Sequence, residues 1–223
     1  MSLSFASYAT DEDVAVRAPG DYSVLCPAWQ TLSAGGDGVF AGGSPWVLSS
    51  ASAGFSGQGA AAGHVVLLSG PKPQFKGTGL LFAVDSAAAG SVTLRNIGMP
   101  SGVGNPPGPF AGLTGVSFTI PHLTPQIESA CLEANHEFGL DPNLGISNPG
   151  LLYDPARELA QFVVLTVLRR LYADAKHGQG DFAEKLKQAS IDLSALRSRV
   201  TVRFGTLGES ELPKNQFSTQ VRR

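Results

Sequence analysis

Residues 159–176 read LAQFVVLTVLRRLYADAK, and this stretch decides how the second half of the chain is organised. Its spacing predicts a helix, yet the middle of that helix is apolar on nearly every side. A helix of this kind is normally buried between neighbouring elements. We therefore expect it to be the centre of a helical layer, packed by its neighbours, with one face meeting either the sheet domain or another subunit.

Signals for helix ends divide the second half into three helices, predicted over residues 125–138, 154–177 and 181–200. Each follows or begins with a capping residue, Thr124, Asp154 or Asp181, whose side chain can accept a hydrogen bond from the first turn. Gly139 and Gly178 end the first two helices. The HGQG link after the second helix is so short that the second and third helices should be antiparallel neighbours.

The first half has a different composition. Residues 1–120 hold 20 of the 27 glycines but only ten charged side chains, whereas residues 121–223 hold 24. Thr10 is a candidate cap for a short helix over TDEDVAV. Beyond it, four short apolar runs between Gly, Pro and Ser clusters predict strands of a small antiparallel sheet or barrel: HVVLLSG, GLLFAVDS, GSVTLRNIG and LTGVSFTI.

The predicted fold class is therefore α+β, in three parts. A Gly-rich antiparallel β module with loops is expected over residues 1–120, and an α-helical bundle of about three helices over residues 121–204. An extended C-terminal tail follows over residues 205–223, after a short strand from Thr201 to Phe204. The tail has too little apolar content to fold alone, so it either stays extended or orders against a partner.

Charge, cysteines and hydropathy exclude several classes of protein. The formal net charge of -2 and the pI near 6.1 lack the basic excess of tight nucleic-acid binders. Cys26 and Cys131 lie far apart, which indicates neither a disulfide framework nor a four-ligand zinc site. The N-terminus lacks a secretory signal, and the run FVVLTVL is far shorter than the roughly 20 residues of a membrane span. We expect a soluble, non-exported protein without membrane contact.

No catalytic motif is present. The stretch GQGAAAG precedes a strand and lacks the GxGxxG spacing, and neither GxxxxGK[ST] nor GxSxG occurs. Glu128, Glu133 and Glu137 fall on one helix with nothing beside them that would raise a pKa. Metal-ligand spacing is missing among the four histidines, which are His64, His122, His136 and His177. The sequence therefore predicts a protein that is not an enzyme and has no catalytic, cofactor-binding or metal-binding residues.

The order of parts in the second half resembles a known family. A helix ends in FGLDP, the long helix LAQFVVLTVLRRLYADAK follows, a third helix capped by DF leads into SRVTVRFG, and an extended polar tail comes last. This order resembles that of the tailed-phage head-to-tail connector adaptors, also called head completion proteins. The resemblance covers residues 121–223. Residues 1–120 depart from it, because compact family members lack so large a Gly-rich insertion.

The resemblance implies a structural virion protein without a cofactor. It would form a homo-oligomeric ring of twelve copies in the neck of the particle, dock on the portal protein through its C-terminal extension, and present its opposite face to stopper or tail proteins. DNA would pass through the channel during genome packaging and ejection without sequence-specific binding. The ring would assemble in the host cytoplasm and reside in the virion.

The resemblance also implies roles for particular residues. The portal-docking segment would be Thr201 to Arg223, with four apolar anchors and two terminal charges: Phe204, Leu212, Phe217, Val221, Arg222 and Arg223. Subunit contacts are expected from the long helix, at Phe162, Leu165, Arg169, Arg170 and Tyr172. For the two arginines an alternative is that one reaches solvent and the other pairs with an acid.

Three other functions stay open. The protein could be a tail-completion or baseplate component of the same kind of particle. It could be a ligand- or carbohydrate-binding β module on a helical stalk, with aromatic side chains that either stack on sugar or pack in the sheet core: Trp29, Phe40, Trp46 and Phe55. An enzyme with an unfamiliar active site is the third alternative.

Overall fold

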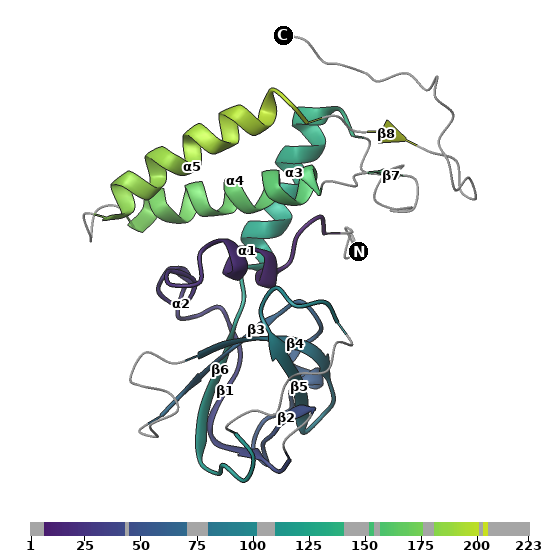
Figure 1. Cartoon of the computed structure of the whole chain (residues 1–223), viewed down its shortest axis with the longest axis vertical. Helices are drawn as coiled ribbons and strands as arrows, with labels where there is room; N and C mark the ends of the chain where they lie inside the picture. Colours follow the sequence, from purple (N-terminus) through teal and green to yellow (C-terminus); the bar gives the residue numbers. More distant parts are fainter. Residues whose placement is uncertain are drawn as a thin grey trace. The chain divides into compact units, whose positions relative to one another are not determined.

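The computed structural model describes residues 7–42, 45–70, 80–101, 110–140, 152–153, 157–175, 181–200 and 203–204. The chain divides into two compact units (Figure 1). One, the barrel unit, is Thr10–Leu123; the other, the helical unit, combines Met1–Ala9 with Thr124–Arg223. The chain therefore crosses between the units twice, and the barrel unit is an insertion in the helical one.

The barrel unit contains a closed barrel of antiparallel strands in the order β1-β2-β5-β4-β3-β6. This corrects the predicted fold: the Gly-rich β module with loops was wrong, because the strands close on themselves, although the overall class is α+β. The strands are β1 (Thr31–Phe40), β2 (Trp46–Ser49), β3 (Val65–Ser69), β4 (Leu80–Ala87), β5 (Ser91–Asn96) and β6 (Val116–Pro121). The short helices are α1 (Asp11–Arg17), α2 (Tyr22–Leu25) and the 3-10 turn η1 (Ser56–Gln58).

Strand β1 is, with β2, one of the two barrel strands that the sequence rules missed. Its sequence, TLSAGGDGVF, contains three glycines and has the composition of a loop. In the barrel, a Cβ atom on Gly35 would lie 2.7 Å from Cζ of Phe118, and one on Gly38 would lie 2.7 Å from the carbonyl oxygen of Val116. The pairing of β1 with β6 shifts register twice. Such irregularities bend a strand, and here they allow β1 to pair with both β2 and β6.

Aromatic side chains fill the barrel. Trp46 packs edge-on against Phe82 and Phe110, with ring centroids 5.5 Å apart in both pairs. Phe55 contacts Phe118 at 5.3 Å. A small barrel has room for side chains and no open channel, so these rings form the core of the unit.

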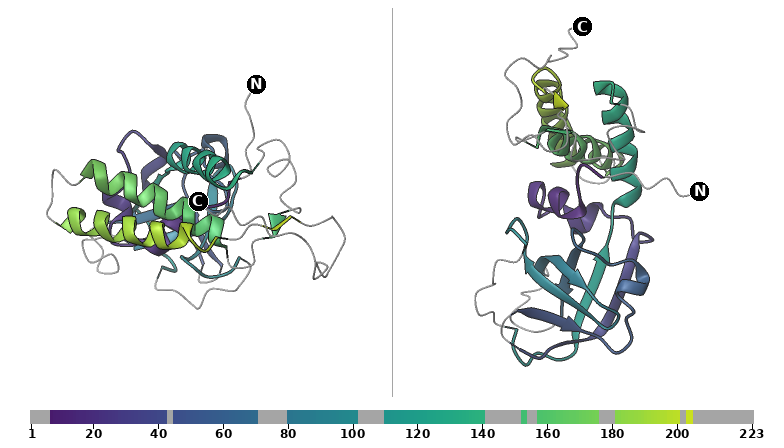
Figure 2. Two further views of the ribbon diagram at one scale, coloured as in Figure 1. Left: turned by 90° about the horizontal axis from the view of Figure 1, so that it is seen from above. Right: turned by 90° about the vertical axis from the view of Figure 1, so that its right-hand side faces the viewer.

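The helical unit contains α3 (Thr124–Phe138), α4 (Glu158–Ala175) and α5 (Asp181–Arg197), with a two-stranded sheet of β7 (Leu152–Tyr153) and β8 (Arg203–Phe204). Helix α4 packs against both α3 and α5, and eleven of its eighteen residues are buried. It lies alongside α5 and crosses α3 (Figure 2). The expectation of a helix at the centre of a helical layer is confirmed. The helix begins at Glu158, later than predicted, and its predicted cap, Asp154, lies outside the described residues.

An N-terminal segment that carries no sequence signal also belongs to the helical unit. The hydroxyl of Tyr8 donates a 2.6 Å hydrogen bond to Oδ1 of Asn135 on α3. Oγ of Ser7 lies 3.8 Å from Sγ of Cys131, which is buried on the same helix. These contacts hold the start of the described chain against α3. The next residue of note, Thr10, caps α1 as predicted, in a capping box with Asp13.

Candidate functional site

The apolar residues predicted for subunit contacts lie inside the helical unit. Phe162 is fully buried, and Leu165 and Tyr172 are nearly so. The ring of Phe162 meets that of Phe138 at 5.0 Å, and the ring of Tyr172 stacks on Phe182 at 5.8 Å. These side chains pack against α3 and α5 of their own chain, which leaves them little surface to offer to a second subunit.

The two predicted arginines lie at the surface of the same helix, around one acid of α3. Nη2 of Arg170 lies 2.5 Å from Oε2 of Glu133, and its Nη1 donates to Oγ of Ser129 at 3.0 Å. Nη2 of Arg169 lies 3.8 Å from Oε1 of Glu133. Arg197, from α5, reaches the same oxygen at 3.3 Å. We call Glu133 and these three arginines the arginine cluster.

The arginine cluster has more positive than negative charge and is open to solvent. Each of its arginine side chains is about one-third exposed, and Glu133 is one-quarter exposed. Glu137 lies 3.8 Å from Nε of Arg197, so among the residues that the structure describes two acids face three guanidinium groups. Guanidinium groups bind carboxylates and phosphates through paired N–H donors. The cluster can therefore accept an acidic group of a partner while it joins three helices of its own chain.

The predicted portal-docking residues cannot be placed in the same way. Leu212, Phe217, Val221 and the two terminal arginines lie outside the described residues. The backbone of Phe204 pairs with that of Leu152 in the β7–β8 sheet. The docking role of this segment stays a prediction.

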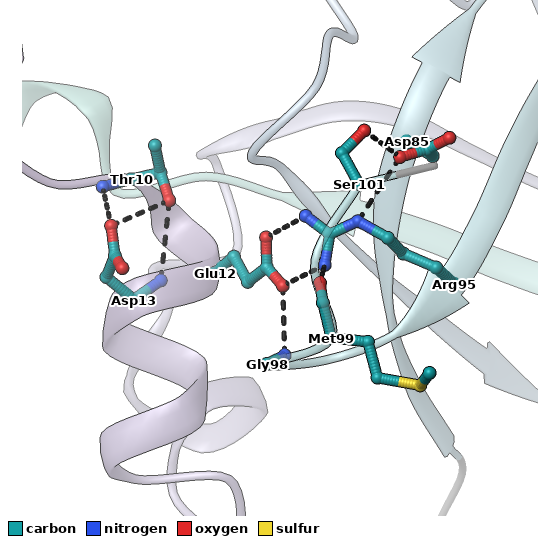
Figure 3. Close-up of polar contacts among 8 residues, drawn as sticks. All are labelled: Thr10, Glu12, Asp13, Asp85, Arg95, Gly98, Met99 and Ser101. Atoms are coloured by element: carbon teal, nitrogen blue, oxygen red, sulfur yellow. Dashed lines mark hydrogen bonds and ion pairs between the residues drawn. The ribbon is translucent and has the colours of Figure 1, made fainter. Parts of the chain in front are cut away.

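A buried ion pair that the sequence did not indicate fastens α1 to the barrel (Figure 3). Nη1 and Nη2 of Arg95 on β5 each lie 2.5 Å from an oxygen of Glu12 on α1. The amide of Gly98 donates to the same carboxylate at 2.9 Å, and Arg95 also donates to the carbonyl of Met99. Asp85 lies 3.3 Å from Nε of Arg95. The hydrogen bonds and nearby acids raise the pKa of Arg95. We call this group the α1 anchor.

A second buried acid, Asp11, directly precedes Glu12 on α1, and neutral groups donate its hydrogen bonds. Its side chain accepts hydrogen bonds from the amide of Leu123 at 2.6 Å and from the hydroxyl of Tyr22 at 3.0 Å. Burial raises the pKa of Asp11 to about 6, although both hydrogen bonds act in the opposite direction. Nε2 of His64 lies 3.7 Å from Oδ2 of Asp11. We call Asp11, Tyr22, His64 and Leu123 the neck.

The neck combines groups that occur in acid–base sites, but its burial favours a structural role. Asp11 is 3% exposed and Tyr22 is 1% exposed. Burial raises the pKa of the neighbouring Cys26 to about 12, which keeps its thiol protonated and a poor nucleophile. A substrate would have to displace the Leu123 and Tyr22 hydrogen bonds to reach the carboxylate. We therefore interpret the neck as a structural feature.

The four aromatic residues considered for stacking on a ligand divide into two groups. Phe40, Trp46 and Phe55 are buried in the barrel core, which confirms the packing alternative for them. Trp29, in the turn after α2, is 84% exposed. An indole with this exposure contributes nothing to the core, so Trp29 is a second candidate contact with a partner.

In the part of the chain that the structure describes, no group of three or more His, Cys, Asp or Glu side chains could hold a metal ion. Across the same residues, no helix has the length and hydropathy needed to span a bilayer. Comparison with family models, with curated proteins and with solved structures found no match to the chain.

Proposed function

We propose that the protein is a structural component of a tailed-phage particle, namely a head-to-tail adaptor. Its copies form a ring, dock on the portal through their C-terminal tail, and join the portal to the neck or tail of the phage particle. DNA passes through the channel of this ring. The proposal rests on the resemblance of residues 121–223 to that family. Neither a cofactor nor a catalytic step is part of it.

The observation that carries most weight is the helical unit. It contains α3, α4 and α5 in the order on which the resemblance depends, and β8 leads directly into residues 205–223. The barrel unit is inserted before α3, so it leaves the order of these parts unbroken. An insertion of this kind suits an adaptor that carries an additional module.

The arginine cluster supports contact with another protein. Arginine and tryptophan are enriched among the residues that dominate binding energy at protein interfaces. In a ring, each subunit uses two different surfaces, one toward each neighbour. Because Phe162, Leu165 and Tyr172 are buried within the chain, we assign the contact on this side to Arg169 and Arg170 instead.

Affinity capture from cells that produce virus particles tests the proposal. The tagged full chain should retrieve a portal-like ring protein, and a chain that lacks residues 205–223 should not. A second variant keeps the full tail length but replaces the apolar residues Leu212, Phe217 and Val221 by serine, and we expect it to lose the portal as well. Retrieval of tail or baseplate proteins by all three chains would assign the protein to a lower part of the particle, and retrieval of no virion protein would refute a virion role.

The exposure of Trp29 favours a second candidate function, which is ligand binding by the barrel unit. Exposed indole rings stack on the apolar faces of sugars, and this side chain is available to do so. A glycan array probed with the full chain and with Trp29→Ala tests this function. Binding that the substitution removes would support it, and an array without signal would exclude the glycans tested.

A further inference from the structure

Both chain connections between the two units meet at one buried carboxylate of the barrel unit. The chain enters this unit at Thr10 and leaves it at Leu123. The side chain of Asp11, the second residue after entry, accepts a 2.6 Å hydrogen bond from the amide of Leu123, the last residue before exit. Asp11 is 3% exposed, so water cannot replace this bond while the neck is closed.

Several titratable groups face Asp11 from the elements packed around it. Tyr22 on α2 donates to the carboxylate, and Cys26 follows the same helix. His64 precedes β3 and His122 follows β6. When protonated, His122 favours the ionised form of Asp11, but burial outweighs this effect.

A hydrogen bond to His64 defines which of its ring nitrogens carries the proton in the neutral form. Its Nδ1 accepts a 3.0 Å hydrogen bond from the amide of Ala61, so in the neutral ring the proton is on Nε2, the atom that faces Asp11. Burial also lowers the pKa of His64. The closest contacts of Asp11 are therefore neutral donors, in contrast to the guanidinium that binds Glu12.

We propose that Asp11 is a proton-operated clamp at the neck. Its protonated form keeps the hydrogen bond with the Leu123 amide closed, and its ionised form allows this bond to open locally. The physical reason is the loss of water around a buried charge. Opening returns the ionised carboxylate to water and relieves that loss, whereas a neutral carboxyl group gains much less from opening.

The direction of the pH dependence follows from proton linkage. The pKa of Asp11 is about 6 in the closed neck and 3.8 for an exposed aspartate, so the closed state binds the proton more tightly. Closure is therefore favoured as the pH falls below 6, and this contribution is lost as the pH rises through 6. From these two pKa values, the opening equilibrium constant should rise about tenfold between pH 5 and pH 7.5.

Amide hydrogen exchange of the full chain, followed by NMR, tests the clamp. The quantity to measure is the protection factor of the Leu123 amide, corrected for the pH dependence of intrinsic exchange. We expect it to fall about tenfold from pH 5 to pH 7.5 and to stay well below that of Val66, which lies in the barrel core and exchanges only when the whole unit unfolds, at both pH values. In Asp11→Asn, which cannot ionise, the Leu123 value should not vary with pH.

Three results would overturn the proposal. A Leu123 protection factor that is independent of pH in the unmodified chain would exclude proton control. An equal change in Asp11→Asn would assign the effect to another group, such as His64 or His122. A Leu123 protection factor equal to that of Val66 at both pH values would show that this amide exchanges only through unfolding of the whole unit, and not through local opening. The comparison of Leu123 with Val66 uses the unmodified chain, so it decides the matter even if the variant does not fold.

Discussion

The α1 anchor of the barrel unit and the arginine cluster of the helical unit both bind a glutamate to arginine across separate elements, but they differ in burial. The side chains of Arg95 and Glu12 are 11% and 12% exposed, whereas those of the arginines around Glu133 are about one-third exposed. Water screens the second group and not the first. The buried pair is committed to the fold, whereas the exposed cluster can exchange its contacts for those of a partner.

Among the changes at charged residues, removal of the buried arginine should have the largest effect. Arg95→Ala leaves the Glu12 carboxylate buried without its partner, which should lower the free energy of unfolding by about 3 kcal/mol. Urea denaturation of the full chain measures it. The matched control, Arg95→Met with Glu12→Gln, removes both charges and should lose less. A loss below 1 kcal/mol in Arg95→Ala would mean that solvent reaches the α1 anchor, and the contrast with the arginine cluster would fail.

Asp11 extends the comparison to a buried acid whose contacts are neutral donors. Because its pKa is raised to about 6, its ionisation should lower the free energy of unfolding by about 1.4 kcal/mol between pH 5 and pH 7.5. This contribution is present at low pH and disappears as the pH rises through 6. The difference between the unmodified chain and Asp11→Asn, measured by denaturation at both pH values, isolates it from other carboxyl groups. A difference that stays constant with pH would contradict the raised pKa.

Arg170 tests the exposed side of the comparison. Arg170→Ala removes the closest contact of the arginine cluster, yet it should change the free energy of unfolding by less than about 1 kcal/mol, because the pair is partly solvated. The same change should weaken self-assembly, which analytical ultracentrifugation measures. Arg199→Ala is a suitable control, because Arg199 is more exposed and lies outside the cluster. Unchanged assembly in Arg170→Ala would remove the cluster from the subunit interface.

The smallest effect on stability is expected at Trp29. Since 84% of this side chain is exposed, Trp29→Ala should change the midpoint of thermal unfolding by no more than the experimental scatter. Trp46→Ala, at a buried ring of the barrel core, should in contrast cost about 3 kcal/mol or more. If Trp29→Ala also destabilised the chain strongly, its ring would have to pack within the fold and could not serve a partner.

Local sequence signals predicted the elements whose causes are local. Thr10 begins α1 as its cap, and Gly139 adopts a positive φ of 63° directly after α3. A cap acts over three or four residues, so the sequence alone contains the information. Four of the six barrel strands follow in the same way from short apolar runs between turns.

Long-range packing decided the rest. β1 reads as a loop because its glycines are needed by Phe118 and Val116 on a strand some eighty positions away in the chain. The Arg95–Glu12 pair and the Asp11–Leu123 bond likewise join residues far apart in sequence. In the candidate site, Arg169 and Arg170 were identified from the sequence. The sequence did not show that they share the acid Glu133, because the packing of α3 against α4 brings these side chains together. Local patterns contain no information on which distant side chains share a space, so burial, barrel closure and the pKa of Asp11 emerge only in the folded chain.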